Sequence, residues 1–341
     1  MSNKKRKLGR KGMAILIGEE KDRDAVWVRR LYEELKKCPL PRDCELQILS
    51  VERLCMDIDG QVKNWPYGVC NRIPESSPPK IQKLGLAVLQ YAELLGLPVF
   101  NPAFCYAIGS NKLLHHGILS ACRLKSPKSV LVRSAKAAIE GAARLNYPLL
   151  LKPNSAGYGK GITRFSTQEE LEQYFSRHKD SEKCFGRDGT ALLQEYYESL
   201  GSACYRVWTL RGKIQCAIKV TRPNGGFGGA CMSDSCSLTR TIVEAVEIDP
   251  DIQRSILKIE TLCQSDCSSV EFLYNANKPD EIVFFDVNML STLPVLPNNK
   301  VLHSEKRWGE GYNPWKELAS CVYRKLFGTL VFVERLKPRG T

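Results

Sequence analysis

Residues 149–162 read LLLKPNSAGYGKGI, the most informative stretch of the chain. A run of three leucines, typical of a buried strand, delivers Lys152 into a glycine-rich loop that also contains Lys160. The loop's glycines alternate with other residues, at Gly157, Gly159 and Gly161. Glycines let a backbone approach a ligand closely and turn its N–H groups inward, which favours anions. The stretch therefore predicts a polyphosphate site, the alternative being a hairpin tip with solvated lysines.

The composition is ordinary for a globular protein. The 341 residues are 43% hydrophobic and 26% charged, and a chain of this length can form two or three lobes with buried cores. No apolar stretch reaches the roughly 18–20 residues that span a bilayer. The segment Met1–Arg10 is polar and basic, unlike a secretory signal. We therefore expect a cytoplasmic protein with no membrane contact.

The cysteines argue for a reducing compartment. Fourteen cysteines without a signal peptide predict free thiols, not a disulfide framework. The pairs Cys231/Cys236 and Cys263/Cys267 lack the spacing of a zinc ribbon, and the chain has only four histidines. The pattern therefore disfavours structural zinc.

The formal charge of +13 favours anionic partners, such as a nucleotide and an acidic substrate. Six basic residues cluster near the start of the chain: Lys4, Lys5, Arg6, Lys7, Arg10 and Lys11. We interpret residues 1–11 as a disordered basic tail, with a nuclear address or a nucleic-acid arm as alternatives. Residues 331–341 are predicted to form a second basic tail.

Strand and helix alternate over the first hundred residues, which predicts a small α/β lobe with a parallel sheet. The predicted strands are 13–18, 46–51, 69–73 and 98–100. The predicted helices are 25–37 and 81–95.

The rest of the chain predicts a mixture of helices and strands. The helices are expected at 111–122, 135–145, 169–175 and 249–263. The strands are expected at 130–132, 149–152, 191–197, 205–210, 213–220, 270–274 and 281–287. We predict an N-terminal domain at 12–108, a central lobe at 109–190 and a C-terminal lobe at 191–330.

Three oxygen-bearing side chains lie on the last two predicted strands. Glu271 is on one of them, and Asp286 and Asn288 are on the other. Side chains two apart on a strand face the same way, so Asp286 and Asn288 project together. Carboxylate and amide oxygens suit magnesium that also holds substrate phosphates. An Asp-x-Asn at a strand end is also common turn chemistry, so the assignment depends on partners elsewhere.

These features, in their order, resemble the ATP-grasp superfamily, and most of all its RimK-type ligases, which join a carboxylate to an amine at the cost of ATP. The resemblance covers roughly residues 70–295. The matching features are Lys112, Lys152, the loop Ser155–Gly161, Gln194-Glu195-Tyr196-Tyr197, Arg206, Glu271 and Asp286-Val287-Asn288. The resemblance implies an α/β (α+β) ATP-grasp fold, with an N-terminal parallel-sheet lobe before two lobes that sandwich ATP.

The resemblance also implies roles for individual residues. Lys112 and Lys152 would contact the ATP phosphates, and the hinge at 194–197 would hold adenine. Arg206 would lie near the γ-phosphate and act in catalysis with Lys152. The loop residues over the phosphates would be Ser155, Gly157, Tyr158, Gly159, Lys160 and Gly161. The magnesium ligands would be Glu271, Asp286 and Asn288.

The implied chemistry needs no protein nucleophile. A carboxylate substrate attacks the γ-phosphate, and an amine then opens the acyl phosphate. Positioning and charge neutralisation by lysine, arginine, metal and backbone N–H groups suffice for such a transfer. The substrates would be a small-molecule or peptide carboxylate and an amine, and the basic charge suits acidic ones. Nothing in the sequence indicates an oligomeric state.

The chain departs from the family pattern at several positions. Asp286 replaces the usual Glu, and Glu271 replaces the usual Asp, so each metal arm changes by one methylene. Cys204 stands where many relatives have an acid that holds ribose, and Glu198 is the candidate to take its place. Residues 225–236 lack the basic, Asn-containing loop of RimK-type enzymes. The second substrate is therefore the part of the function that the resemblance defines least.

Two other functions compete with a ligase. An ATP-grasp kinase of a phosphorylated polyol, such as an inositol phosphate, also carries an Asp-x-Asn strand, and Tyr205-Arg206-Val207 and Arg222-Pro223-Asn224 resemble such kinases. A non-catalytic nucleotide or nucleic-acid binding protein would use the basic charge. Aromatic residues interleaved with basic ones, as in nucleic-acid motifs, are missing from the sequence. Neither a Walker A motif nor a protein-kinase His-Arg-Asp loop is present.

Overall fold

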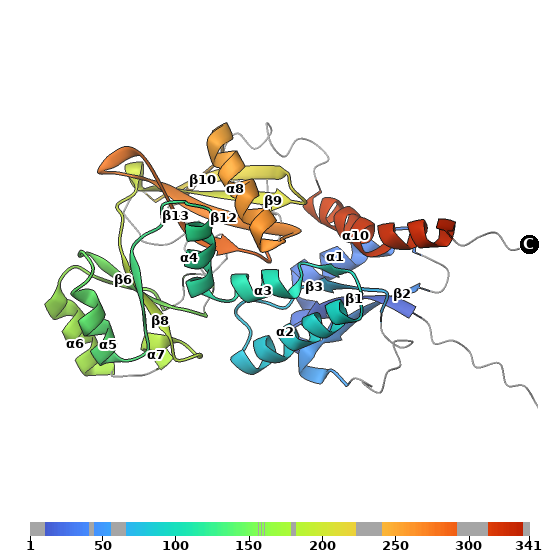
Figure 1. The fold of residues 1–341 in the computed structure, drawn as a ribbon, viewed down its shortest axis with the longest axis horizontal. Coiled ribbons are helices and arrows are strands. Elements are labelled where there is room, and N and C mark those ends of the chain that lie inside the picture. Colours follow the sequence, from blue (N-terminus) through green and yellow to red (C-terminus); the bar gives the residue numbers. More distant parts are fainter. Residues whose placement is uncertain are drawn as a thin grey trace, which may run out of the picture. The chain divides into compact units, whose positions relative to one another are not determined.

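The computed structural model describes residues 11–40, 44–55, 66–155, 157, 159, 161–178, 182–222, 241–291 and 313–336. The chain divides into two compact units (Figure 1). The first combines Met1–Ala103 with Asn313–Thr341, and the second is Phe104–Tyr312. Each unit is described separately.

The first unit is built on a four-stranded parallel sheet in the order β2-β1-β3-β4. Its strands are β1 (Lys11–Ile17), β2 (Cys44–Ser50), β3 (Gly68–Asn71) and β4 (Val99–Phe100). Residues 13–17 of β1 are all buried, as expected for a central parallel strand whose two faces are both covered. The predicted N-terminal parallel sheet is confirmed. Lys11, assigned by the sequence to the tail, begins β1, and the remainder of that tail lies outside the described residues.

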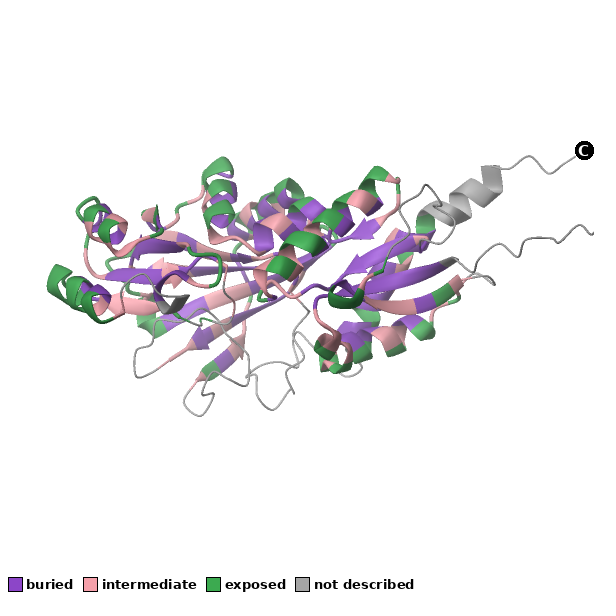
Figure 2. Ribbon diagram, turned by 90° about the horizontal axis from the view of Figure 1, so that it is seen from below, coloured by how far each residue is buried: buried purple, intermediate pink, exposed green. Residues whose placement is uncertain are grey.

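Amphipathic helices accompany this sheet, with buried and exposed faces that Figure 2 distinguishes. They are α1 (Val26–Lys36), α2 (Pro79–Leu94) and α10 (Pro314–Leu336), with short 3₁₀ turns η1 (Glu20–Asp24) and η2 (Val51–Arg53). The domain boundaries predicted from the sequence differ from this grouping. They put residues 314–330 in the C-terminal lobe and residues 331–341 in a tail. Helix α10 instead packs on α1, β3 and β4, because Leu318, Val322 and Leu326 form a buried stripe. A Cβ on Gly68 would lie 2.9 Å from Leu326 Cδ2, so glycine permits this close approach.

The second unit contains two antiparallel sheets. The first has the order β5-β8-β6-β7. Its strands are β5 (Ser129–Val132), β6 (Leu149–Pro153), β7 (Thr163–Phe165) and β8 (Ala191–Glu195). The helices around it are α5 (Ala135–Ala142), α6 (Gln168–His178) and α7 (Glu182–Phe185). Leu149 and Leu151 join the hydrophobic core with these helices, so Leu150 and Lys152 face the opposite side.

The second sheet of this unit has the order β11-β10-β9-β12-β13. Its strands are β9 (Ala203–Leu210), β10 (Ile214–Thr221), β11 (Ile242–Ala245), β12 (Cys267–Asn275) and β13 (Lys278–Asn288). The other helices are α3 (Ala103–Gly109), α4 (Lys112–Ala121), α8 (Pro250–Cys263) and the 3₁₀ turn η4 (Leu200–Ser202). Val207, Val270 and Val287 pack with α4 and α8, which leaves the other face of the sheet for polar side chains.

Two chemical expectations concern the whole chain. All cysteines among the described residues are free thiols, in agreement with the expected reduced state. Within the described part of the chain, no helix has the length and apolar character needed to cross a bilayer.

A buried carboxyl on α8 should make the stability of the second unit depend on pH. Burial raises the pKa of Glu260 from 4.5 to about 7, and its Oε2 accepts a hydrogen bond from the Gly212 N–H at 3.1 Å. The folded carboxyl binds its proton more tightly than the unfolded one, so the free energy of unfolding falls as pH rises from about 4.5 to about 7. We expect Glu260→Gln to stabilise the protein at pH 8 by roughly 1–3 kcal/mol and to have little effect near pH 5.

Urea unfolding at the two pH values checks this expectation. Glu140→Gln, an exposed substitution on α5, is the matched control and should change neither curve. An equal loss of stability at both pH values in Glu260→Gln would contradict it.

Candidate nucleotide site

The two sheets of the second unit line one pocket with the faces that point away from their hydrophobic cores. Its open volume, which includes solvent space at the mouth, is about 610 Å³. Leu150, Lys152 and Gln194 contribute from one sheet, and Leu273 and Phe285 from the other. The further lining residues are Pro127, Ile162, Glu195, Tyr196, Tyr197, Ser199, Ser202, Cys204 and Arg222.

The predicted adenine hinge, 194–197, lies along this pocket with all four residues. Its two members after Gln194 are tied into the fold: the N–H groups of Glu195 and Tyr196 donate to the carbonyls of Lys128 and Pro148, both at 2.9 Å. The Glu195 carboxylate accepts two hydrogen bonds from Asn146, at 3.0 Å from its backbone N and 2.9 Å from its Nδ2. Its side chain therefore fixes the strand end.

The predicted ribose end is built differently from the expectation. Glu198 forms an ion pair with Arg164 at 3.3 Å and is not among the lining residues. Cys204 lines the pocket, and its thiol lies 3.9 Å from an Arg222 nitrogen. Burial raises the pKa of Cys204 to about 12, so this position carries a neutral group. The role of Glu198 toward ribose stays a prediction.

Lys152 extends from β6 across the pocket. Its Nζ donates to Gln194 Oε1 at 2.5 Å and lies 5.8 Å from the centre of the Phe285 ring. Burial, reinforced by nearby Lys112, lowers the pKa of Lys152 to about 8, although Asp286 and Glu271 act in the opposite direction. A lysine so placed loses hydration that an anionic ligand would replace.

Arg206, Glu271 and Asp286 form a row across three neighbouring strands, β9, β12 and β13. The strand register pairs Glu271 with Arg206 on one side and with Asp286 on the other. Directly paired residues of antiparallel strands project from the same face, so all three side chains lie on one face of the sheet. The chain thus brings together the predicted catalytic arginine and both predicted metal-binding carboxylates.

The Arg206 guanidinium is held in place by several groups. Its Nη1 lies 3.3 Å from Glu271 Oε1, its Nε donates to Ser269 Oγ at 2.9 Å, and an Nη2 donates to Ser291 Oγ at 2.9 Å. The cation also lies 5.0 Å from the centre of the Trp208 ring. Such support presents a positive charge without reorganisation, which electrostatic catalysis requires.

A β-bulge shapes the end of β13. Glu271 pairs with Asp286, whereas the next residue, Phe272, pairs with Phe284, so Phe285 is the extra residue. Phe284 and Val287 belong to the hydrophobic core, while Phe285 lines the pocket. Strict alternation would send only one of Phe285 and Asp286 to the ligand side, and a bulge re-aims such side chains.

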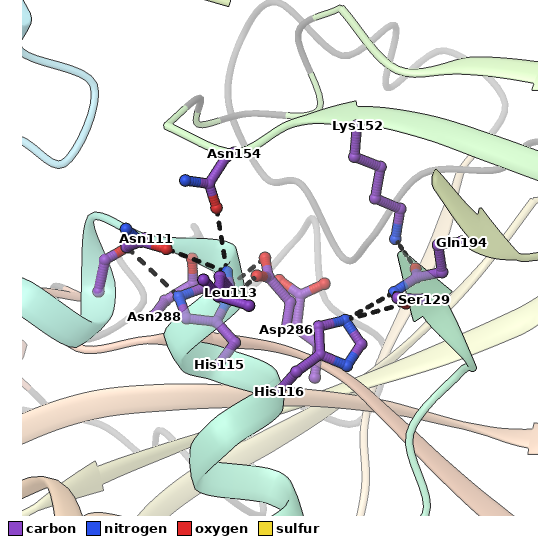
Figure 3. A network of polar contacts seen from close by, with 12 residues as sticks. Asn111, Leu113, His115, His116, Ser129, Lys152, Asn154, Gln194, Asp286 and Asn288 are labelled. Atoms are coloured by element: carbon purple, nitrogen blue, oxygen red, sulfur yellow. Dashed lines mark hydrogen bonds and ion pairs between the residues drawn. The ribbon is translucent and has the colours of Figure 1, made fainter. Parts of the chain in front are cut away.

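His115 on α4 fixes the position of the Asp286 carboxylate. Its Nδ1 lies 3.1 Å from Asp286 Oδ1, as Figure 3 shows, and the ring is buried. Burial opposes ionisation of Asp286, but His115 together with Lys112 and Lys152 outweighs it and holds the pKa of the carboxyl well below its usual range. Asp286 is therefore an anion, with Asn288 Nδ2 3.5 Å from its other oxygen.

The donor set fits magnesium. Asp286 Oδ1 is buried without an aligned hydrogen bond, which leaves a lone pair for another partner. Two carboxylates and an amide oxygen are hard ligands on adjacent strands. The described residues contain no cluster of three His, Cys, Asp or Glu side chains able to hold a metal alone. A magnesium ion held by Glu271, Asp286 and Asn288 would therefore need further ligands such as phosphate oxygens, the usual arrangement for this ion.

Lys112 occupies the first position of α4, next to the glycine-rich loop. Asn111 caps the helix by accepting from the Leu113 N–H at 3.1 Å, and Asn154 Oδ1 accepts from the same N–H at 3.0 Å. The Lys112 N–H donates to the Asn154 carbonyl at 3.2 Å. The end of β6 and the N-terminus of α4 are thus joined, which places both predicted phosphate-binding lysines in one region.

The glycine-rich loop is described in part. Ser155 donates its hydroxyl to Asp188 at 2.6 Å, so this predicted phosphate contact has a structural partner. Gly159 and Gly161 have φ of 69° and 76°, where side chains are strained, and a Cβ on Gly161 would lie 2.9 Å from Pro153 Cγ. Gly157 is partly buried, while Tyr158 and Lys160 lie outside the described residues.

Comparison with solved structures identifies the architecture. A RimK domain protein from Sphaerobacter thermophilus, titled an ATP-grasp protein, is 17% identical, with a TM-score of 0.60 over 91% of this chain and 99% of that chain. The ATP-grasp ligase PsnB with a minimal precursor is 15% identical, with a TM-score of 0.60 over 92% of this chain and 98% of that chain. The chain therefore shares the fold of these ATP-grasp proteins. The predicted fold class is confirmed.

Sequence comparison adds distant relatives of the chain. No protein-family profile matches it. A D-alanine–D-alanine ligase from Maridesulfovibrio salexigens is 30% identical over 206 residues, which is 58% of this chain and 61% of the ligase. Urea amidolyase from Saccharomyces cerevisiae is 26% identical over 175 residues, or 48% of this chain. The chain spans only 9% of that amidolyase.

Some residues of the candidate site were not predicted from the sequence. His115, His116 and Ser129 support the charged side chains, and Asp188 organises the base of the loop. The adjacent histidines, following Lys112 on an otherwise apolar helix, were the available signal, because two of the four histidines in the chain occur there. Ser129 and Asp188 have no local pattern that distinguishes them from turn residues.

The lowered pKa of Lys152 predicts a pH dependence of nucleotide binding. In the protein without nucleotide, about half of the Lys152 side chains are protonated near pH 8. The affinity for a polyphosphate should therefore fall as pH rises through that value. Between pH 7 and 9 we expect the Kd for ADP to rise about tenfold, in step with the lost ammonium. Isothermal titration calorimetry across this range measures the effect.

Lys152→Met should bind ADP weakly with a nearly flat pH profile. Lys136→Met, at an exposed position on α5, is the control and should retain the wild-type profile. An unchanged pH profile in Lys152→Met would show that another group titrates.

Proposed function

We propose that this ATP-grasp protein is an ATP- and magnesium-dependent ligase that joins a carboxylate to an amine through an acyl phosphate. One observation carries the proposal. The row Arg206–Glu271–Asp286 and the side chain of Lys152 lie on the sheet faces that point away from the hydrophobic cores. The hinge 194–197 lines the pocket to which these faces contribute. The relatives that are ligases support the same class of reaction.

The residues suffice for the proposed chemistry. A substrate carboxylate oxygen attacks the γ-phosphorus, the bond to the β,γ-bridging oxygen breaks, and ADP leaves. An amine then attacks the acyl carbon, the phosphate departs, and the amine loses a proton as the amide forms. Arg206 and Lys152 neutralise charge on the transferring phosphoryl group. Glu271, Asp286 and Asn288 would hold magnesium, which supplies charge neutralisation to the phosphates.

The substrates are proposed as a carboxylate and an amine, either small or peptidic. The neighbour PsnB is titled as complexed with a precursor peptide, and another relative is named a D-alanine–D-alanine ligase. The net charge of +13 favours acidic substrates. A cytoplasmic location, with a nuclear one as the alternative, stays a prediction.

A polyol-phosphate kinase is the second candidate. The Asp-x-Asn strand serves a kinase equally well, and Arg222 lines the pocket as an additional cation. The two candidates share ATP and magnesium and differ in the fate of the γ-phosphoryl group. A non-catalytic binding protein would consume no ATP.

A product screen separates these functions. The protein is incubated with ATP, magnesium and paired panels of carboxylates and amines, with phosphorylated polyols in parallel. We expect ADP and free phosphate only when a carboxylate is present, and a new amide by mass spectrometry when an amine is added. A polyol that gains a further phosphate group, with no release of free phosphate, would overturn the ligase proposal in favour of the kinase.

Asp286→Ala should lower this turnover by about 100-fold or more, because it removes a central anion from the proposed metal site. Asp280→Ala is the matched control: it lies on the same strand at an exposed position and should retain activity. Turnover that survives in Asp286→Ala would show that the metal assignment is wrong.

A further inference from the structure

A chain of polar contacts runs from Lys152 to helix α4 (Figure 3). The Gln194 side chain is buried and uses both ends of its amide. Its Oε1 accepts from Lys152 Nζ at 2.5 Å, and its Nε2 lies 3.0 Å from His116 Nε2 and 3.0 Å from Ser129 Oγ. Gln194 therefore connects the lysine to a histidine that does not line the pocket.

The chemistry of the donors fixes the direction of every bond in this chain. A lysine ammonium can only donate, so Gln194 must present its oxygen to Lys152. Its NH₂ group, which also only donates, then faces His116 Nε2, and that nitrogen must accept. Ser129 Oγ, which accepts from Gln194 Nε2, lies 2.9 Å from the Pro127 carbonyl and 3.2 Å from His116 Nε2. Its hydroxyl can donate to either of these acceptors, and neither choice requires a proton on His116 Nε2.

His116 must then be neutral, with its proton on Nδ1. Nδ1 lies 3.4 Å from Ser126 Oγ, which can accept that proton. The environment favours the same state, because burial first, and then the charges of Lys152 and His115, lower the pKa of His116 to about 4. At the other end of this series of contacts, the pKa of Lys152 is affected by the carboxylates Asp286 and Glu271 and by the cation Lys112.

We propose that His116 is a positioning residue: its unprotonated Nε2 sets the orientation of the Gln194 amide, which holds the Lys152 ammonium toward the nucleotide phosphates. The part played by Lys152 rests on the proposed function, whereas the direction of the hydrogen bonds does not. A proton on His116 Nε2 would oppose the Gln194 NH₂ group, favour the flipped amide and face Lys152 with a donor.

Imidazole NMR with nitrogen-15 labelling tests the polarity without any substrate. The chain has only four histidines. The signal that is absent from the spectrum of His116→Gln is therefore assigned to His116. We expect the Nδ1–H tautomer for His116 in the wild-type protein. In Gln194→Glu, a carboxylate accepts from Lys152 and has no proton for the ring. His116 should then become a donor at Nε2 and titrate at a higher pH. An Nε2–H tautomer in the wild-type protein would overturn the proposal.

Binding of ADP with magnesium tests the consequence for the site. His116→Leu removes the acceptor and should weaken binding about tenfold, while His116→Gln offers an amide oxygen near the position of Nε2 and should restore it to within about threefold. Thermal unfolding of both variants checks that they fold equally well. Equal affinities for the two variants would contradict a positioning role. A wild-type protein that binds no nucleotide would overturn the proposed function, while the tautomer still decides the polarity.

Discussion

The alternation of side chains along the two antiparallel sheets of the second unit is the constraint on which the site depends. Each sheet buries one face in a hydrophobic core with helices, so the other face receives every second residue. Lys152 and Gln194 reach the pocket because Leu151 and Leu193 fill the core beside them. On the other sheet, register places Arg206, Glu271 and Asp286 side by side. The charged groups thus converge through packing of apolar neighbours.

The strand register also bears on Glu271 and Asp286, the two predicted magnesium ligands that depart from the family pattern. Relative to the family pattern, the carboxylate on one strand is longer by a methylene and that on the other is shorter. In the structure these residues, Glu271 and Asp286, are directly opposed, so the two changes of length compensate within one pair. His115 holds the shorter arm and Arg206 lies against the longer one. The departure is thereby consistent with retention of a cation site.

Sequence reasoning could predict the parts of the site that follow simple periodicity. The apolar run before Lys152, the Asp-x-Asn strand and the order of the motifs were sufficient to predict the fold class. The bulge at Phe285 could not be predicted, because it depends on the register between β12 and β13. The grouping of α10 with the first unit depends on the apolar stripe Leu318, Val322 and Leu326, a pattern that fits any hydrophobic surface. Glu195 matched the hinge motif and Glu198 was the candidate for the ribose acid, but their contacts with Asn146 and Arg164 come from distant parts of the chain.

The hydrogen bonds around Gln194 place a further constraint on the site. Lys152, whose pKa is lowered to about 8, donates to a neutral acceptor, the amide oxygen of Gln194. The amide can accept this bond only in one orientation, so its second contact becomes important. His116 and Ser129 provide that contact from α4 and β5.

Isotope transfer tests the proposed chemistry most directly. Carboxylate substrates labelled with oxygen-18 are supplied with ATP, magnesium and an amine, and the released phosphate is analysed by mass spectrometry. The acyl-phosphate account predicts that each phosphate carries one oxygen-18 atom from the carboxylate, and that the amide retains the other. Phosphate without label, or a phosphoryl group transferred to a hydroxyl, would contradict it.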